Sequence, residues 1–555
     1  MNASSPLGAH FQGEQQCSFL VWAPNVEQVE VRVKTPAERV FPLRRDERGY
    51  HYGLVEGLEP GGRYYYCLDQ SVERPDPASS FQPEGVHGPS EVIDPAFDWE
   101  DQGWFGLPLR DYLIYELHVG TFTPEGTFDA IIPLLPELIE LGVTALELMP
   151  VAQFPGARNW GYDGVYPYAV QDSYGGPSGL KRLVNACHQC GLAVVLDVVY
   201  NHLGPEGNYL REFGPYFTDR YRTPWGAALN FDGEHSQEVR RFFLENALRW
   251  QTQFHLDALR LDAVHAIKDC SARPFLQELA QLTRQRSEQL NRRFYLIAES
   301  DLNDARLTAP EVLGGYGLDG QWSDDFHHSL HVLLTGERDG YYMDFGGTGL
   351  LAKVFREGYA YTGQYSAYRR QPHGNSPRLN SAKQFVVYSQ NHDQVGNRRD
   401  GDRLSRLAHL EGLKLAAGTV LLSPFIPLLF MGEEYGEPAP FQYVISHTDP
   451  ELVEAVRHGR RAEFAPFAWP EQVPDPHAES TFQQCILNRE LLRSDPTHRA
   501  LYDFYRELIR LRRELPAIAH ADKSTLQADA LEPEQVLRVL YDDSVGPVCM
   551  LCCFA

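Results

Sequence analysis

Residues 255–265 read HLDALRLDAVH, a short alternating segment that ends in charge. Leu259 and Leu261 alternate with Arg260 and Asp262, which is the pattern of a strand with one apolar face. A strand buried in a parallel barrel should be mostly apolar, so a guanidinium and a carboxylate there need partners. One interpretation is that Arg260 and Asp262 form a structural ion pair. The other is that Arg260 keeps the Asp262 carboxylate ionised at the C-terminal end of a barrel strand, where barrel enzymes have their catalytic groups.

The chain around this segment repeats the order strand, loop, helix. Further short apolar segments that we expect to be strands are 113–119, 145–150, 193–199, 294–298, 320–322, 384–389 and 427–431. Helical patterns occur at 128–141, 180–190, 236–254 and 274–285. Eight such units within residues 96–515 predict an enlarged (β/α)₈ TIM barrel of the α/β class. The loop at 203–235 is long and rich in Tyr, Pro and Gly, which favours a functional loop.

Two smaller β regions flank this predicted barrel. Residues 1–95 contain short alternating segments separated by Gly and Pro turns, which predicts a β-sandwich domain. After a helix expected at 502–515, residues 516–555 become β-like and begin a short C-terminal domain. Two or three strands cannot bury a face alone, so these strands lean on the barrel or the chain is shortened.

The amino-acid composition argues against several classes of function. The formal net charge of −25 argues against nucleic acid or an anionic membrane as a partner. No window approaches about 18 uninterrupted apolar residues, and the N-terminus has no signal-peptide pattern. Nine cysteines, an odd number in a long chain, indicate a reducing compartment, so we expect a cytoplasmic enzyme. The lone C-x-x-C at 187–190 is assigned to core packing, and we expect neither a metal nor a cofactor.

Four of the predicted strands end in acidic or imidazole side chains. These residues are Asp197 and His202, then Asp262, then Glu299, and finally His392 and Asp393. One such ending is ordinary as a helix N-cap. Four on one face of one barrel predict a pocket lined by carboxylates.

The spacing of two of these carboxylates indicates a reaction class. Asp262 and Glu299 end consecutive strands, which run about 4.8 Å apart. A separation of about 5 Å matches a retaining glycosidase, whereas an inverting pair needs roughly 6.5–9.5 Å. Beside Arg260, Asp262 should have a lowered pKa and serve as nucleophile. Facing other carboxylates, Glu299 should have a raised pKa and serve as acid/base, while Asp393 can stabilise an oxocarbenium-like charge.

The four strand ends resemble the conserved regions of the α-amylase family of glycoside hydrolases, and residues 1–95 resemble its carbohydrate-module-like domain. The resemblance implies that Asp262 is the nucleophile, Glu299 the proton donor and Asp393 the transition-state stabiliser. It also implies a subsite for the cleaved glucosyl unit formed by Tyr162, Asp197, His202, Arg260 and His392. Asn201 lies where some amylases bind calcium, but the rest of that site is not evident, so no metal is predicted.

Segments 75–90, 115–122, 297–304 and 321–328 resemble the branch of this family that releases trehalose from maltooligosyltrehalose. This resemblance implies hydrolysis of the α-1,4 bond next to the terminal trehalose, and functional pairing with an enzyme that forms maltooligosyltrehalose. The residues implied on the leaving-group side are Trp225, His265, Asp324, Asp325, His327 and Glu434. At the start of the fourth predicted strand, this chain has Ala258 where the family resemblance implies a glycine.

Two alternatives stay open. A glycogen branching or debranching enzyme shares the same domain plan and carboxylates. A non-catalytic oligosaccharide-binding protein on this fold should lack one or more of the three carboxylates, and all three are present here.

Overall fold

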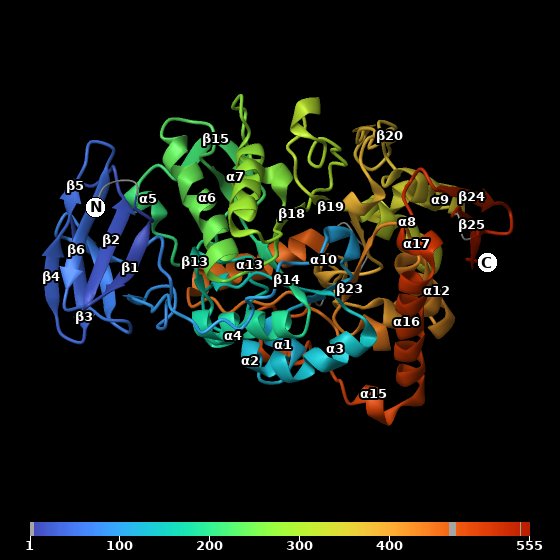
Figure 1. Ribbon diagram of the computed structural model, residues 1–555, viewed down its shortest axis with the longest axis horizontal. Helices are drawn as coiled ribbons and strands as arrows, with labels where there is room; N and C mark the ends of the chain where they lie inside the picture. The colour runs from blue at the N-terminus through green and yellow to red at the C-terminus, as the bar shows by residue number, and fades with distance from the viewer. Residues whose placement is uncertain (1–4, 465–472, 544–545) are drawn as a thin grey trace.

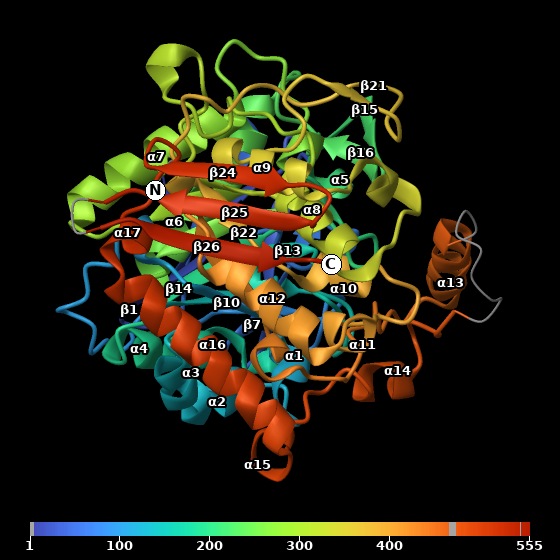
Figure 2. The same ribbon diagram turned by 90° about the vertical axis from the view of Figure 1, so that its right-hand side faces the viewer.

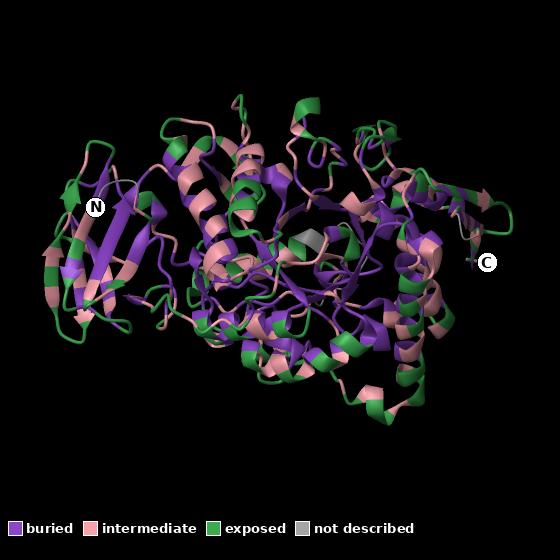
Figure 3. Ribbon diagram, viewed as in Figure 1, coloured by how far each residue is buried: buried purple, intermediate pink, exposed green. Residues whose placement is uncertain are grey.

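The computed structural model describes residues 5–464, 473–543 and 546–555 (Figure 1). Eight parallel strands close into a barrel in chain order, which confirms the predicted TIM-barrel fold. They are β10 (Ile114–Leu117), β11 (Ala145–Leu148), β14 (Ala193–Val198), β17 (Ala258–Leu261), β18 (Tyr295–Ala298), β19 (Gly320–Trp322), β22 (Phe385–Val387) and β23 (Ile426–Phe430). These strands are buried, as Figure 3 shows, which explains their nearly continuous apolar sequence.

The helices that cover the barrel follow the predicted order with shifted ends. The longer ones are α4 (Gly176–Gln189), α6 (Ser236–Gln253), α7 (Phe275–Leu290) and α16 (Pro496–Glu514). The single helix predicted at 128–141 is instead α2 (Phe128–Ile131), a 3-10 turn and α3 (Leu135–Leu141). Pro133 and Pro136 explain the break, because proline has no N–H to donate to the preceding turn.

The remaining helices complete the structure. They are α1 (Val119–Phe122), α5 (Leu210–Phe213), α8 (Asp324–Thr335), α9 (Thr348–Glu357), α10 (His392–Gly396), α11 (Leu404–Leu407), α12 (Leu410–Leu421), α13 (Pro450–Phe464), α14 (Glu479–Gln483), α15 (Leu491–Ser494) and α17 (Pro516–Ala519). Within the described ranges, none of the helices has the length and apolar character needed to cross a bilayer.

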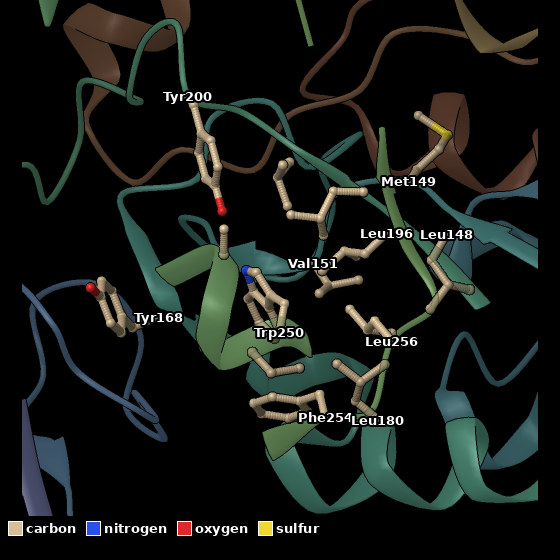
Figure 4. Packing of buried hydrophobic residues seen from close by; sticks show 14 of the residues in the cluster. Leu148, Met149, Val151, Tyr168, Leu180, Leu196, Tyr200, Trp250, Phe254 and Leu256 are labelled. Atoms are coloured by element: carbon tan, nitrogen blue, oxygen red, sulfur yellow. The ribbon is translucent and has the colours of Figure 1, made fainter. Parts of the chain in front are cut away.

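Side chains from strands and helices interlock where the barrel meets its outer layer. Trp250 of α6 packs beside Phe254, against Leu180 of α4 and the strand residues Leu148 and Leu196 (Figure 4). Trp250 is 1% exposed, so its replacement by alanine should cost about 3–5 kcal/mol of folding free energy. This packing fixes the barrel strands whose ends form the site described below.

The N-terminal region folds into two antiparallel sheets. One contains β1 (Gly8–Gly13), β2 (Gln16–Trp22), β6 (Tyr50–Glu56) and β5 (Arg44–Arg45). The other contains β4 (Arg39–Pro42), β3 (Val29–Thr35), β7 (Arg63–Leu68), β8 (Val72–Arg74) and β9 (Ser90–Glu91). Phe19 and Tyr64, one from each sheet, meet edge to face at 4.9 Å between ring centroids, as expected for a sandwich core.

The C-terminal strands lean on the barrel. β24 (Leu526–Leu531), β25 (Val536–Tyr541) and β26 (Val548–Cys553) form an antiparallel sheet that lies across α9 and α12 in Figure 2. Their inward side chains join the hydrophobic cluster of those helices, and the Tyr541 hydroxyl donates to the Leu422 carbonyl at 2.6 Å. The expectation that these strands pack against the barrel is therefore confirmed.

Three two-stranded hairpins lie outside the barrel sheet. They are β12 (Ala152–Gln153) with β13 (Tyr166–Val170), β15 (Phe217–Thr223) with β16 (Gly226–Leu229), and β20 (Tyr365–Ser366) with β21 (Gln371–Pro372). The β15–β16 and β20–β21 hairpins lie on the same, upper side of the molecule in Figure 1. The first lies within the 203–235 loop that the sequence singled out.

Candidate active site

Two carboxylates leave neighbouring barrel strands at the same level. β17 and β18 pair with Leu261 opposite Ala298, so Asp262 and Glu299 are the next residues on each strand. Ala263 then adopts a left-handed φ of 40° and its N–H donates to Glu299 Oε2 at 2.6 Å. A non-glycine residue in that conformation is strained, and such strain concentrates at functional sites.

Arg260 joins three carboxylates from three adjacent strands. Its Nη1 lies 2.8 Å from Asp197 Oδ2 and 2.7 Å from Asp262 Oδ1, and its Nη2 lies 3.6 Å from Glu299 Oε2. The guanidinium is fully buried, and its centre lies 4.4 Å from the Trp322 ring centroid. A buried charge held this way fixes the carboxylates relative to one another.

The two carboxyl groups have opposite pKa shifts. Burial pushes the pKa of Asp262 upward, but the charges of Arg260 and His202 and a hydrogen bond from Asn201 outweigh it, so the pKa falls below its ordinary value. Burial is the main reason that the pKa of Glu299 is raised well above its ordinary value, and neighbouring carboxylates add to this effect. Sequence reasoning predicted both directions but attributed the second to the neighbouring carboxylates alone.

Asn201 holds the Asp262 side chain, a role that the sequence did not reveal. Its Nδ2 donates to the backbone oxygen and to Oδ2 of Asp262, both at 2.8 Å. Its Oδ1 lies 2.5 Å from His202 Nδ1. Asn201 also lies at the position where some amylases bind calcium. Among the described residues, no group of three or more His, Cys, Asp or Glu could hold a metal ion.

A second group of side chains lies beside these carboxylates. The Tyr162 hydroxyl donates to Asp197 Oδ2 at 2.6 Å, and its ring stacks on His392 at 5.2 Å. His392 Nδ1 lies 2.5 Å from Glu116 Oε1, and the backbone N–H of His392 donates to Glu116 Oε2 at 3.0 Å. Burial lowers the pKa of His392, but Asp393 and Glu116 outweigh this effect and raise it to about 9. His392 is therefore a cation at neutral pH, and Glu116, which sequence reasoning missed, fixes its orientation.

Asp393 is the most open of the three predicted catalytic carboxylates. It lies in the first turn of α10, in the segment that follows β22, and its side chain is 39% exposed. Oδ2 lies 3.5 Å from His392 Nε2, and Oδ1 accepts a hydrogen bond from Asn397 at 3.2 Å. The side chain is therefore exposed enough to contact a ligand.

Three residues predicted on the leaving-group side lie at the edge of this site. Trp225, in the β15–β16 hairpin, is half exposed and stacks on His202 at 4.7 Å between ring centroids. Asp324, at the start of α8, accepts hydrogen bonds from Tyr388 and Gln394, and burial raises its pKa to about 6. His265 is partly exposed, three residues beyond Asp262.

The structure places Asp325, His327 and Glu434 behind the site rather than in it. Asp325 Oδ2 accepts three hydrogen bonds, from the Asn303 side chain and from the backbone of residues 360 and 361. His327 lies between the Ser389 carbonyl and a tyrosine hydroxyl. Glu434 is fully buried and accepts from a buried tyrosine. These contacts are made within the protein, and the substrate contacts expected for the three residues stay predictions.

The amino-acid sequence is similar to those of known glycoside hydrolases. The family "Alpha amylase, catalytic domain" matches residues 98–230, and carbohydrate-binding module 48 (isoamylase N-terminal domain) matches residues 6–81. A malto-oligosyltrehalose trehalohydrolase of Saccharolobus solfataricus is 49% identical over 501 residues, which span 90% of this chain and 86% of the relative. One of Arthrobacter ramosus is 49% identical over 544 residues, spanning 96% and 93%. A branching enzyme of Bacillus caldolyticus is 30% identical over only 57% of the chain.

Solved structures show the same architecture. The structure of an α-amylase-like protein from Salmonella typhimurium superposes with a TM-score of 0.92 and 41% identity, covering 99% of this chain and 93% of that one. A pullulanase from Paenibacillus barengoltzii superposes with a TM-score of 0.73 at 20% identity, which indicates shared fold alone.

Proposed function

The chain belongs to the malto-oligosyltrehalose trehalohydrolase family, and we propose that Asp262, Glu299 and Asp393 carry out its reaction. The enzyme is a glycoside hydrolase that cleaves the α-1,4-glucosidic bond next to the terminal trehalose of maltooligosyltrehalose. The products are trehalose and a maltooligosaccharide. The observation that carries the residue assignment is the shared contact of Arg260 with Asp262 and Glu299.

The proposed mechanism is a double displacement. The ionised Asp262 attacks the anomeric carbon while Glu299 donates its proton to the glycosidic oxygen, and trehalose departs. The glucosyl unit is then joined to Asp262 as an ester. Glu299, now ionised, takes a proton from water, whose oxygen attacks the anomeric carbon and releases Asp262. Two inversions give net retention of the α configuration, and the steps use the Asp262 and Glu299 side chains and one water molecule.

The remaining residues support these steps. Arg260 keeps Asp262 ionised, and Asp393 stabilises the positive charge that develops on the glucosyl ring. Tyr162 offers an aromatic face to the sugar, and Asp197, His202 and His392 bind its hydroxyl groups. Trp225 supplies a further aromatic face at the rim.

We further propose the setting in which the enzyme acts. The negative charge suits a neutral substrate, and all nine cysteines are free thiols, which supports a cytoplasmic location. An enzyme that forms maltooligosyltrehalose must supply the substrate, so functional pairing with one follows. The separate strand systems support three domains, at residues 1–95, 96–515 and 516–555.

Product analysis with two substrates tests this function. Maltotriosyltrehalose and maltopentaose have the same number of glucose units and differ in the final linkage. Rapid trehalose release from the first and slow cleavage of the second support the proposed chemistry. Equal cleavage, or transfer products with new branch points, would assign the chain to an amylase or branching activity on the same barrel.

A further inference from the structure

A cavity of about 740 Å³ lies at the end of the barrel opposite the proposed catalytic carboxylates. Its lining includes Tyr295, the first residue of β18, and Asp319, which directly precedes β19. Lys383 and Gln384 line it as well, in the 3-10 turn that precedes β22. Glu299 follows the other end of β18, so no step of the proposed reaction uses this cavity.

Part of the lining is apolar and aromatic. Pro108 and Leu109 belong to the segment before β10, and Leu318 belongs to the segment before β19. The Tyr295 ring meets Tyr112 edge to face at 5.8 Å between ring centroids, which fixes the Tyr295 ring beside the cavity. Such a surface can pack against the ring of a sugar or of a nucleobase.

The charges that line the cavity differ from those of the chain as a whole. The chain has 75 acidic and 50 basic side chains. The cavity is lined by three basic and two acidic side chains, which are Arg110, Arg284, Lys383, Glu311 and Asp319. Arg284 and Glu311 pair with each other at 3.5 Å. Arg110 and Lys383 therefore face one remaining carboxylate, that of Asp319.

Lys383 lacks a partner among the described residues. Its Nζ is buried and makes no hydrogen bond within that part of the chain. The nearby Asp522 carboxylate accepts instead from the backbone N–H groups of Ala382 and Lys523, at 2.6 and 2.8 Å. Burial is the main reason that the pKa of Lys383 falls to about 7, and the charge of Arg512 adds to the fall. A buried amine without a partner costs free energy, which a bound anion would recover.

Arg110 supplies a second cation near Lys383. Its side chain is 71% exposed and lies 3.8 Å from the Asp111 carboxylate, which is itself 55% exposed. The charge of Arg110 acts on Lys383, so the two cations lie close together. The flexible four-carbon stem of Lys383 lines the cavity and allows Nζ to meet a ligand there.

We propose that this cavity binds a small organic phosphate, with the phosphate group between Arg110 and Lys383 and the organic group against Tyr295. A phosphate monoester carries a charge of about −1.5 to −2 at neutral pH and three acceptor oxygens, so it matches two cations. The Arg110 guanidinium can donate two parallel hydrogen bonds to it, and the Lys383 ammonium can donate further ones. Asp319 Oδ2 accepts from the backbone N–H of Leu296 at 2.9 Å, so Oδ1 can accept from a ligand hydroxyl. This inference does not depend on the trehalose-releasing reaction.

Isothermal titration calorimetry of the full chain with glucose 6-phosphate and with AMP tests the proposal. At least one of them should bind with a dissociation constant of about 1 mM or lower, and the stronger ligand identifies a sugar or a nucleoside as the organic group. Lys383→Met and Arg110→Ala should each weaken this binding at least about tenfold, because each removes hydrogen bonds to a charged group. Lys414→Met is the matched control, since Lys414 pairs with Glu411 at 2.8 Å outside the cavity and should leave the affinity unchanged.

Two outcomes would overturn the proposal. Absence of binding by both phosphates at millimolar concentration would exclude an organic phosphate site. Unchanged affinity in Lys383→Met would place the binding elsewhere, for example in the active site. Lys383→Met should fold, because it removes a buried amine that has no partner among the described residues. Arg110→Ala changes an exposed side chain and gives the same comparison if Lys383→Met does not fold.

Discussion

Arg260 Nη1 lies 2.7 Å from Asp262 Oδ1, with both groups buried at the end of one barrel strand. The same guanidinium approaches Glu299 at only 3.6 Å, through its other terminal nitrogen. The closer carboxylate therefore receives most of the stabilisation of its charge, while burial keeps a proton on the other. These opposite pKa shifts suit the roles proposed above, nucleophile for Asp262 and acid for Glu299.

Replacing Asp262 by asparagine should lower kcat by at least about 10⁴-fold, since the double displacement then lacks its nucleophile. The fold should persist, because Asp197 still pairs with the Arg260 guanidinium. Steady-state kinetics and circular dichroism measure the two effects. A folded variant with near wild-type turnover would contradict the assigned role.

The Glu299→Gln variant should lose hydrolysis of maltotriosyltrehalose but still react with an α-glycosyl fluoride, because fluoride departs without protonation. The pH profile gives a second test. Glu299 must be protonated for the first step, and its pKa is raised, so wild-type kcat/KM falls as pH rises through that pKa, above the range of an ordinary glutamate. With the α-glycosyl fluoride as substrate, this alkaline limb should be absent in the Glu299→Gln variant. A limb that persists would assign the acid to another group.

Asn201→Ala should reduce kcat roughly 10- to 100-fold, because hydrogen bonds to a charged group contribute about 1.5–3 kcal/mol. Asn201 helps to lower the pKa of Asp262, so its removal raises that pKa. Activity requires ionised Asp262 and is lost as pH falls, so the acid limb should move to higher pH. A variant with lower kcat and an unmoved acid limb would show that Asn201 acts on another group.

Sequence reasoning predicted the barrel well and the site in part. Each barrel strand is a buried apolar run, and charged side chains follow four of these runs, so Asp262 and Glu299 could be predicted as site residues from the sequence. Asp324 and Asp325 are adjacent at the start of α8, and successive helical residues point in different directions. Only the structure separates the residue that faces the site from the one that faces the core. The cavity at the opposite end of the barrel is lined by distant segments and has no local pattern.

Stability should depend on pH through Glu433, which lies beneath the site and accepts a hydrogen bond from Ser389. Burial raises the pKa of Glu433 to about 8, whereas in the unfolded chain it ionises near about 4.3. The folded state therefore binds more protons between these values, and the free energy of unfolding falls as pH rises from about 5 to 8.

The Glu433→Gln variant carries no such proton, so its Tm should match that of the wild type at about pH 4, below the unfolded pKa, and exceed it at pH 8. Differential scanning calorimetry measures this difference. Glu411→Gln is the control, since the Glu411 side chain is 72% exposed and should leave the pH dependence unchanged. Parallel Tm curves for wild type and Glu433→Gln would contradict the buried, protonated state.

The most direct test of the central claim is the configuration of the newly formed anomer when maltotriosyltrehalose is hydrolysed. Trehalose has no reducing end, so early proton NMR spectra report only the maltotriose released from the cleaved bond. Double displacement at Asp262 predicts that α-maltotriose appears first and then mutarotates to the mixture. Initial appearance of β-maltotriose would show single displacement by water and would contradict the nucleophilic role of Asp262.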